Sequence, residues 1–107
     1  MPASHRSTVK DADRPVQVTY CPVPNYPRGL AEYGFDGHVI LRFVVDTLGL
    51  PEVEHLVVSE ASNPGFVPAA RRAVTKCRYR PAEKAGQPVR ILVQQRVVFR
   101  FPSKPGT

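Results

Sequence analysis

The two cysteines carry the most reactive side chains of this chain. Cys21 follows a polar N-terminal stretch, and Cys77 falls on the apolar stripe of a predicted helix. An even number of cysteines allows a disulfide in an oxidising compartment, whereas the apolar surroundings of Cys77 equally fit a small buried thiol. Neither cysteine belongs to a Cys-x-x-Cys motif or adjoins a histidine. The sequence therefore does not predict redox or nucleophilic catalysis.

The histidines and carboxylates show no spacing that is typical of a metal site or a catalytic centre. His38 and His55 fall on opposing strands of a predicted hairpin, where they can be neighbours, but two histidines alone make a poor zinc site. Three glutamates near the same hairpin have no partner nucleophile, and the chain has no glycine-rich phosphate loop or serine elbow. We expect no catalytic residue, no metal site, no cofactor and no enzymatic activity.

Length and composition indicate one small folded domain. The chain has 107 residues, of which 42% are apolar and 22% are charged. Fifteen Lys and Arg against nine Asp and Glu give a net charge of +6, which permits acidic partners without selecting one. No apolar run approaches the roughly 20 residues of a membrane span, and residues 1–13 lack the apolar middle of a signal peptide. We expect a flexible leader over 1–14, one domain over 15–101 and a flexible tail over 102–107.

The prolines mark where regular structure is expected. None of the twelve prolines falls within 28–50 or 89–101. Residues 38–46 place Val39, Leu41, Phe43 and Val45 on one face of a period-two pattern rich in β-branched residues, which predicts a strand with one strongly apolar face. A turn at Asp46–Gly49 leads to a second strand over 53–59, so the sequence predicts a hairpin.

The remaining elements complete the predicted fold. An apolar stripe over 66–78 predicts an amphipathic helix, and Pro27 and Gly34 bracket a shorter helix over 27–33. From 89 to 101 one face is apolar apart from Gln95, which predicts a long last strand. Because each strand has one apolar face, both helices must cover the same side. The expected fold is α+β, a small antiparallel three-stranded sheet (the hairpin plus the long C-terminal strand) with two helices packed on one face.

This order of elements, with the residues that separate them, resembles the C-terminal domain of TonB-type energy transducers. The resemblance covers residues 26–101 approximately. The matching motifs are Tyr26-Pro27, Gly34-x-x-Gly37-x-Val39, Phe43-x-Val45-Asp46 with Gly49, Ser59 and Ser62, Phe66-x-x-Ala69-Ala70, Ala73-Val74, Arg78-Tyr79-Arg80-Pro81-Ala82, Gly86-x-Pro88-Val89 and Val97-x-Phe99.

The resemblance implies a periplasmic domain that is anchored to the inner membrane by a segment absent from this chain. It implies binding of the N-terminal TonB-box peptide of a TonB-dependent outer-membrane receptor. An ExbB–ExbD-like inner-membrane complex, reached through the missing N-terminal part, would supply proton-motive force for the import of siderophores or vitamins. The chain is then either an excised domain or a standalone relative.

The resemblance also implies where the peptide binds. The mode is strand addition to the edge of the last strand, through Arg90, Ile91, Leu92, Val93, Gln94, Gln95, Arg96 and Val97. A second receptor contact is implied at Val23, Pro24, Asn25 and Tyr26, although Val23 replaces the family's glutamine and Tyr26 equally fits a core position. The arginines of the last strand fit either charged gatekeepers of an exposed edge or partners of acidic receptor residues.

Two other functions remain compatible with the sequence. The fold can serve as an interaction module in another envelope complex. The basic face of the predicted helix also suits an acidic polymer such as peptidoglycan. Nucleic acid is not expected, because the exposed face of the sheet lacks the aromatic residues of RNA-binding sheets. Strand exchange between copies makes a homodimer a further prediction to test.

Overall fold

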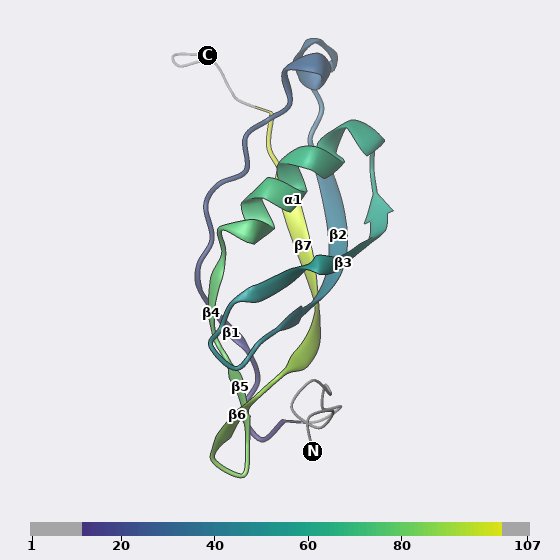
Figure 1. The fold of residues 1–107 in the computed structure, drawn as a ribbon. Helices are drawn as coiled ribbons and strands as arrows, with labels where there is room; N and C mark the ends of the chain where they lie inside the picture. The colour runs from purple at the N-terminus through teal and green to yellow at the C-terminus, as the bar shows by residue number, and fades with distance from the viewer. Residues whose placement is uncertain (1–11, 102–107) are drawn as a thin grey trace.

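The main sheet has three antiparallel strands and confirms the predicted hairpin with a C-terminal strand beside it. The structure is a computed structural model that describes residues 12–101; most of the predicted leader and all of the tail lie outside the described residues. The strands run in the order β3-β2-β7 (Figure 1). Their bounds are Gly37–Val45 for β2, Pro51–Ala61 for β3 and Ile91–Phe99 for β7. The central strand β2 buries Val39, Leu41, Phe43 and Val45 on one face, as its alternation predicts.

A single α-helix covers that apolar face. Helix α1 (Val67–Thr75) follows a short 3-10 turn, η3 (Pro64–Phe66), whose start is capped by the Asn63 side chain accepting from the Gly65 N–H. Its inner stripe buries Ala70 and Val74 completely. The helix ends earlier than the predicted residue 78, because the Cys77 N–H already closes a turn on the Val74 carbonyl.

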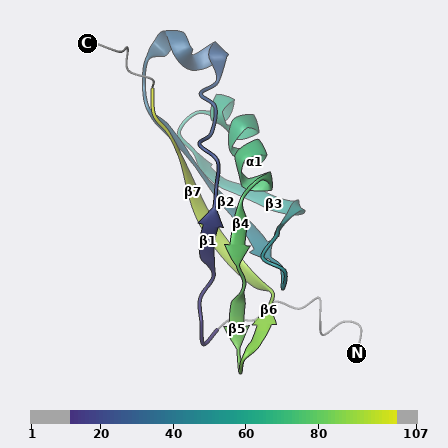
Figure 2. The ribbon, with the colours of Figure 1, turned by 90° about the vertical axis from the view of Figure 1, so that its left-hand side faces the viewer.

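The second predicted helix is not a layer of the sheet. Residues Arg28–Tyr33 form a 3-10 helix, η2, that buries none of its residues and lies beyond the end of the sheet (Figures 1 and 2). Only Leu30 packs partly against the core. A six-residue segment with one inward apolar side chain cannot cover a sheet face. Both predicted helices are therefore present, but only α1 packs on the face of the sheet.

The predicted strand over 89–101 is divided in the structure. Strand β6 (Gln87–Val89) pairs with β5 (Ala82–Lys84) in a separate hairpin, and β7 begins only after Arg90. The tight turn at Ala85 and Gly86 has positive φ at both residues, which allows this small hairpin. The alternating pattern of side chains continues across Arg90, so periodicity alone did not reveal the break.

A two-stranded ribbon, absent from the sequence prediction, stands beside the main sheet. Strand β1 (Gln17–Tyr20) pairs antiparallel with β4 (Arg78–Arg80), and Figure 2 shows the two side by side. Asp13 and Arg14 also pair with the backbone of Glu83. Backbone pairing therefore begins before residue 15, the predicted domain boundary.

Two contacts hold this ribbon in place. A disulfide joins Cys21, just after β1, to Cys77, just before β4. The tip of the β2–β3 hairpin rests on β4, where the Tyr79 N–H donates to the Gly49 carbonyl at 3.0 Å. Gly49 has a φ of +82°, and a Cβ there would stand 2.0 Å from the Tyr79 carbonyl oxygen. Only glycine allows this approach, which fixes β4 relative to the main sheet.

Candidate functional site

One edge of the main sheet has no backbone partner. Strand β7 pairs with β2 along its whole length, and no other strand within residues 12–101 pairs with it. An unpaired edge exposes a row of N–H and C=O groups that can bind another extended chain. The site therefore depends on which residues of β7 direct their backbone outward.

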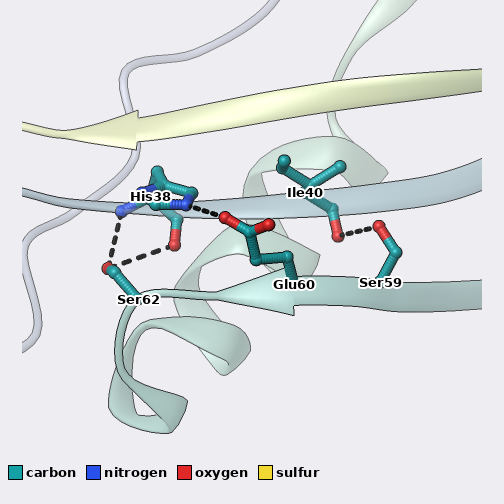
Figure 3. Close-up of polar contacts among 5 residues, drawn as sticks. All are labelled: His38, Ile40, Ser59, Glu60 and Ser62. Carbon is teal, nitrogen blue, oxygen red and sulfur yellow. Dashed lines mark hydrogen bonds and ion pairs between the residues drawn. The ribbon is translucent and has the colours of Figure 1, made fainter.

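The hydrogen bonds between β2 and β3 show which residues of β2 face β7 (Figure 3). In Figure 3 the His38 N–H donates to the Ser62 Oγ at 2.9 Å, and the Ser62 hydroxyl donates to the His38 carbonyl at 3.3 Å. The backbone N–H of Ser62 also donates to this carbonyl, at 2.9 Å. The Ser59 hydroxyl donates to the Ile40 carbonyl at 3.3 Å. The even-numbered residues of β2 thus point their backbone groups toward β3. Because successive residues of a strand point to opposite sides, the odd-numbered residues of β2 face β7.

The register of β2 and β7 then identifies the outward groups. Leu41 lies opposite Gln95 and Phe43 lies opposite Val93, so the odd-numbered residues of β7 bond to β2. The even-numbered residues direct both their N–H and their C=O to the open edge. They are Leu92, Gln94, Arg96 and Val98.

A groove of about 620 Å³ follows this edge. Side chains from both faces of β7 line the groove, which places it against the edge rather than over one face. Its opposite wall comes from the N-terminal segment and from β4. The lining residues are Ala12, Pro15, Val16, Val18, Tyr79, Ile91, Val93, Gln94, Gln95 and Arg96.

The predicted binding residues of the last strand divide into three groups. Five of the eight line the groove, from Ile91 to Arg96 without Leu92. Leu92 is 56% exposed on the outer face, and Val97 belongs to the core. Their contact with a peptide stays a prediction, but the groove places the central part of the stretch beside an open edge.

Arg90, the first of the predicted binding residues, is paired with a carboxylate inside the sheet. Its Nη2 and Nε donate to Glu52 of β3 at 2.6 Å and 2.8 Å, and its side chain is only 17% exposed. The hydrogen bond to Glu52 raises the pKa of Arg90 above its ordinary value. The ion pair connects the start of β7 to β3, and the guanidinium of Arg90 is therefore directed at Glu52 and not at the groove.

The second predicted contact also separates into two parts. Val23, Pro24 and Asn25 line a smaller cavity of about 350 Å³ between the extended segment 22–25 and α1. Tyr26 instead packs its ring edge-on against Phe66, and its hydroxyl donates to the Phe35 carbonyl at 2.5 Å. Of the two alternatives for Tyr26, the structure shows core packing.

Tyr79 belongs to the groove and was not predicted as a site residue. Its hydroxyl donates to the Gln95 Oε1 at 2.6 Å, and burial raises the pKa of Tyr79 to about 12. Two features of the sequence could have indicated this pair. Tyr79 directly follows the helix predicted over 66–78, and Gln95 is the one polar residue on the apolar face of the last strand. The groove wall over residues 12–18 was not predicted. Residues 12–14 were assigned to the leader, and no element was predicted over residues 15–18.

The raised pKa of Tyr79 predicts loss of stability in alkali. The phenol of an unfolded chain titrates near 10, whereas the folded pKa is about 12. The unfolded state therefore releases its proton first, and the contribution of Tyr79 is complete below pH 10 and lost between about pH 10 and 12. Urea unfolding across this range should show a steeper decline for the wild type than for Tyr79→Phe. Parallel curves for the two proteins would contradict the prediction.

Metal binding and membrane spanning find no support in the described residues. Within 12–101 no three His, Cys, Asp or Glu side chains are placed to hold a metal ion. His38 bonds to Glu60, and His55 falls in an irregular stretch of β3 instead of opposite His38, so the two histidines are not the neighbours that the hairpin prediction allowed. No helix in the same range is long and apolar enough to cross a membrane.

A family model described as the C-terminal part of the Gram-negative bacterial TonB protein matches residues 22–101. The chain belongs to the TonB C-terminal family. The solution NMR structure of the Pseudomonas aeruginosa TonB C-terminal domain is similar, with a TM-score of 0.65 and 22% identity over 92% of this chain and 96% of that chain. This similarity supports a TonB C-terminal fold. No curated protein matches the chain significantly. The match to the TonB family includes β7 but begins after β1, so the N-terminal wall of the groove lies outside it.

Proposed function

We propose that this domain binds an extended peptide at the N-terminus of an outer-membrane receptor by adding it as a strand to the free edge of β7. The observation that carries the proposal is the groove beside Gln94 and Arg96, where the outward backbone groups of β7 meet open space. Strand addition uses such groups for affinity and the alternating side chains for specificity. The function proposed is binding rather than catalysis.

Family membership supports the setting of this interaction. We place the domain in the periplasm, joined to the inner membrane and to an ExbB–ExbD-like complex through sequence outside this chain. Proton-motive force delivered through that connection would open the receptor to a siderophore, a vitamin or another scarce nutrient.

The energetics favour a weak and reversible complex. About five new backbone hydrogen bonds at roughly 0.5–1.5 kcal/mol each give several kcal/mol, and association removes about 4 kcal/mol or more. The isolated domain should bind its peptide with micromolar or weaker affinity. Tethering in a full-length protein would raise the effective concentration, so a coupler can hold its receptor and still release it.

A basic surface supports a second candidate, binding of an acidic polymer such as peptidoglycan. Arg72 and Lys76 line the cavity between α1 and segment 22–25. Together with three more cations (Arg71, Arg78 and Arg80) they form no ion pair with a carboxylate in the described part of the chain. This surface lies on other elements than the β7 edge, so one titration can separate the two functions.

The test is a titration of the labelled domain with a receptor N-terminal peptide, followed by amide NMR. The outward amides of Leu92, Gln94 and Arg96 should shift most, and those of Val93 and Gln95, already bonded to β2, should shift less. The response should change little between about 0.05 M and 0.3 M salt, where a polyanion complex would weaken strongly. Shifts confined to α1 and Lys76, without any at the β7 amides, would overturn strand addition in favour of the acidic polymer.

A further inference from the structure

Gln95 is a polar residue in an apolar row. Its neighbours on the inner face of β7 are Val93 and Val97, and it is half-buried at the point where the groove meets the disulfide. A buried amide must find partners for its donors and its acceptor. The partners of Gln95 therefore show what the groove can recognise.

The disulfide sets the orientation of this amide. The Gln95 Nε2 lies 3.6 Å from the Cys21 sulfur and 3.9 Å from the Cys77 sulfur. Disulfide sulfurs carry no hydrogen and can only accept, so the N–H side of the amide faces them. The Oε1 then faces the Tyr79 hydroxyl and accepts its proton at 2.6 Å.

This arrangement leaves hydrogen-bonding capacity on the groove side. Among residues 12–101, the acceptors of Nε2 are the two sulfurs, which are weak and distant. The Tyr79 hydroxyl donates a hydrogen bond to Gln95, and its oxygen keeps lone pairs that can accept a hydrogen bond. Both residues line the groove. Because sulfur is a weak acceptor, the Gln95 N–H groups can still bond to a stronger acceptor, and the Tyr79 oxygen can still accept a hydrogen bond.

We propose that Gln95 and Tyr79 form a polar subsite that selects serine, threonine, asparagine or glutamine at the peptide position opposite Gln95. This inference rests on the proposed strand addition, which brings a side chain of the peptide against each inner-face residue of β7. A neutral hydroxyl or amide both donates and accepts, so it satisfies the two groups together. Apolar side chains two and four positions away would face Val93 and Ile91.

Other side chains fit the subsite less well. An aliphatic side chain would cover the Gln95 N–H without bonding to it, and sites built for hydrogen bonds reject such analogues. A carboxylate would accept from Gln95 but would oppose the lone pairs of the Tyr79 oxygen, and its burial requires desolvation of a charge.

The test uses three synthetic peptides of about ten residues, identical except for a central Thr, Val or Glu between alternating valines. The wild type should bind the Thr peptide about fivefold or more tightly than the other two. In Gln95→Val the order of Thr and Val should reverse. The Gln95 side-chain NH₂ signals of the wild type should shift with the Thr peptide and stay in place with the Val peptide.

Gln87→Val is the matched control, because it makes the same replacement at an exposed residue of β6 that does not line the groove. It should keep the wild-type order of the three peptides. An unchanged order in Gln95→Val, with binding retained, would overturn the subsite and leave strand addition standing. If the wild type binds none of the three peptides, the strand addition on which the subsite rests is overturned instead.

Discussion

Gln94→Pro will weaken capture of the receptor peptide at least tenfold and leave the fold intact. The N–H of Gln94 points to the open edge, since the backbone bonds of β7 to β2 come from the odd-numbered residues. Proline removes that donor and places its ring where the incoming strand must lie, but an edge strand tolerates proline when the lost N–H faced outward. We expect at least a tenfold loss of affinity from one missing hydrogen bond and the steric conflict.

Two variants make this result interpretable. Gln94→Ala changes the same side chain and keeps the N–H, so its affinity should stay near that of the wild type. Gln95→Pro removes an N–H that bonds to β2, and it should destabilise the domain itself. The measurements are peptide affinity by fluorescence anisotropy and thermal unfolding by circular dichroism. Wild-type affinity in a folded Gln94→Pro domain would show that the peptide does not use this edge.

Removal of the disulfide will produce the largest change in stability. Cys21 and Cys77 close a loop with a sequence separation of 56 residues. The loop-entropy model assigns about 4 kcal/mol to a loop of this length. For a domain of this size, each kcal/mol shifts Tm by about 4–8 °C. The Cys21→Ala/Cys77→Ala variant should therefore melt roughly 15–30 °C below the oxidised wild type.

The peptide affinity of the same variant tests whether the disulfide also shapes the groove. Without the disulfide, the β1–β4 ribbon loses its link at the end nearest Gln95, and peptide affinity should fall along with stability. A thiol reductant should lower the Tm of the wild type toward that of the variant and have no effect on the variant. Equal melting of the two proteins before reduction would contradict a structural role for the bond.

The sequence predicted the elements whose burial patterns are long and regular. Strand β2 alternates buried and open positions over nine residues, and α1 places its alanines and Val74 on one stripe. Such a pattern reflects one apolar surface, so it can be recognised within a short stretch of sequence. The first strand of the hairpin, the helix and the last strand were predictable for this reason, whereas β3, whose burial pattern is irregular, was predicted from the turn that precedes it.

The elements that were missed are stabilised by contacts between distant residues. Strand β1 is exposed at all four positions, and it is held by pairing with β4 and by the disulfide, neither of which leaves a periodic pattern. At the break before β7, Arg90 bonds to Glu52, which lies 38 residues earlier. The 3-10 helix η2 lacked the inward apolar side chains that would have drawn it onto the sheet.

The candidate site was predictable as a stretch of sequence but not in its geometry. The resemblance indicated the last strand, yet the outward direction of Leu92, Gln94 and Arg96 follows from the bonds of His38 and Ser62 on the far side of β2. The opposite wall comes from residues 12–18, which were read as leader or left undefined. Both facts require the register of strands that are far apart in the chain.

The wall opposite β7 has a consequence for solubility. In an open sheet, a docked strand offers its own second edge to the next molecule, and assembly can then continue into fibrils. Here the second edge of a docked peptide would face Pro15, Val16 and Val18 across the groove. We therefore expect strand addition to stop after one bound peptide, so that the free edge of β7 does not start aggregation at high protein concentration.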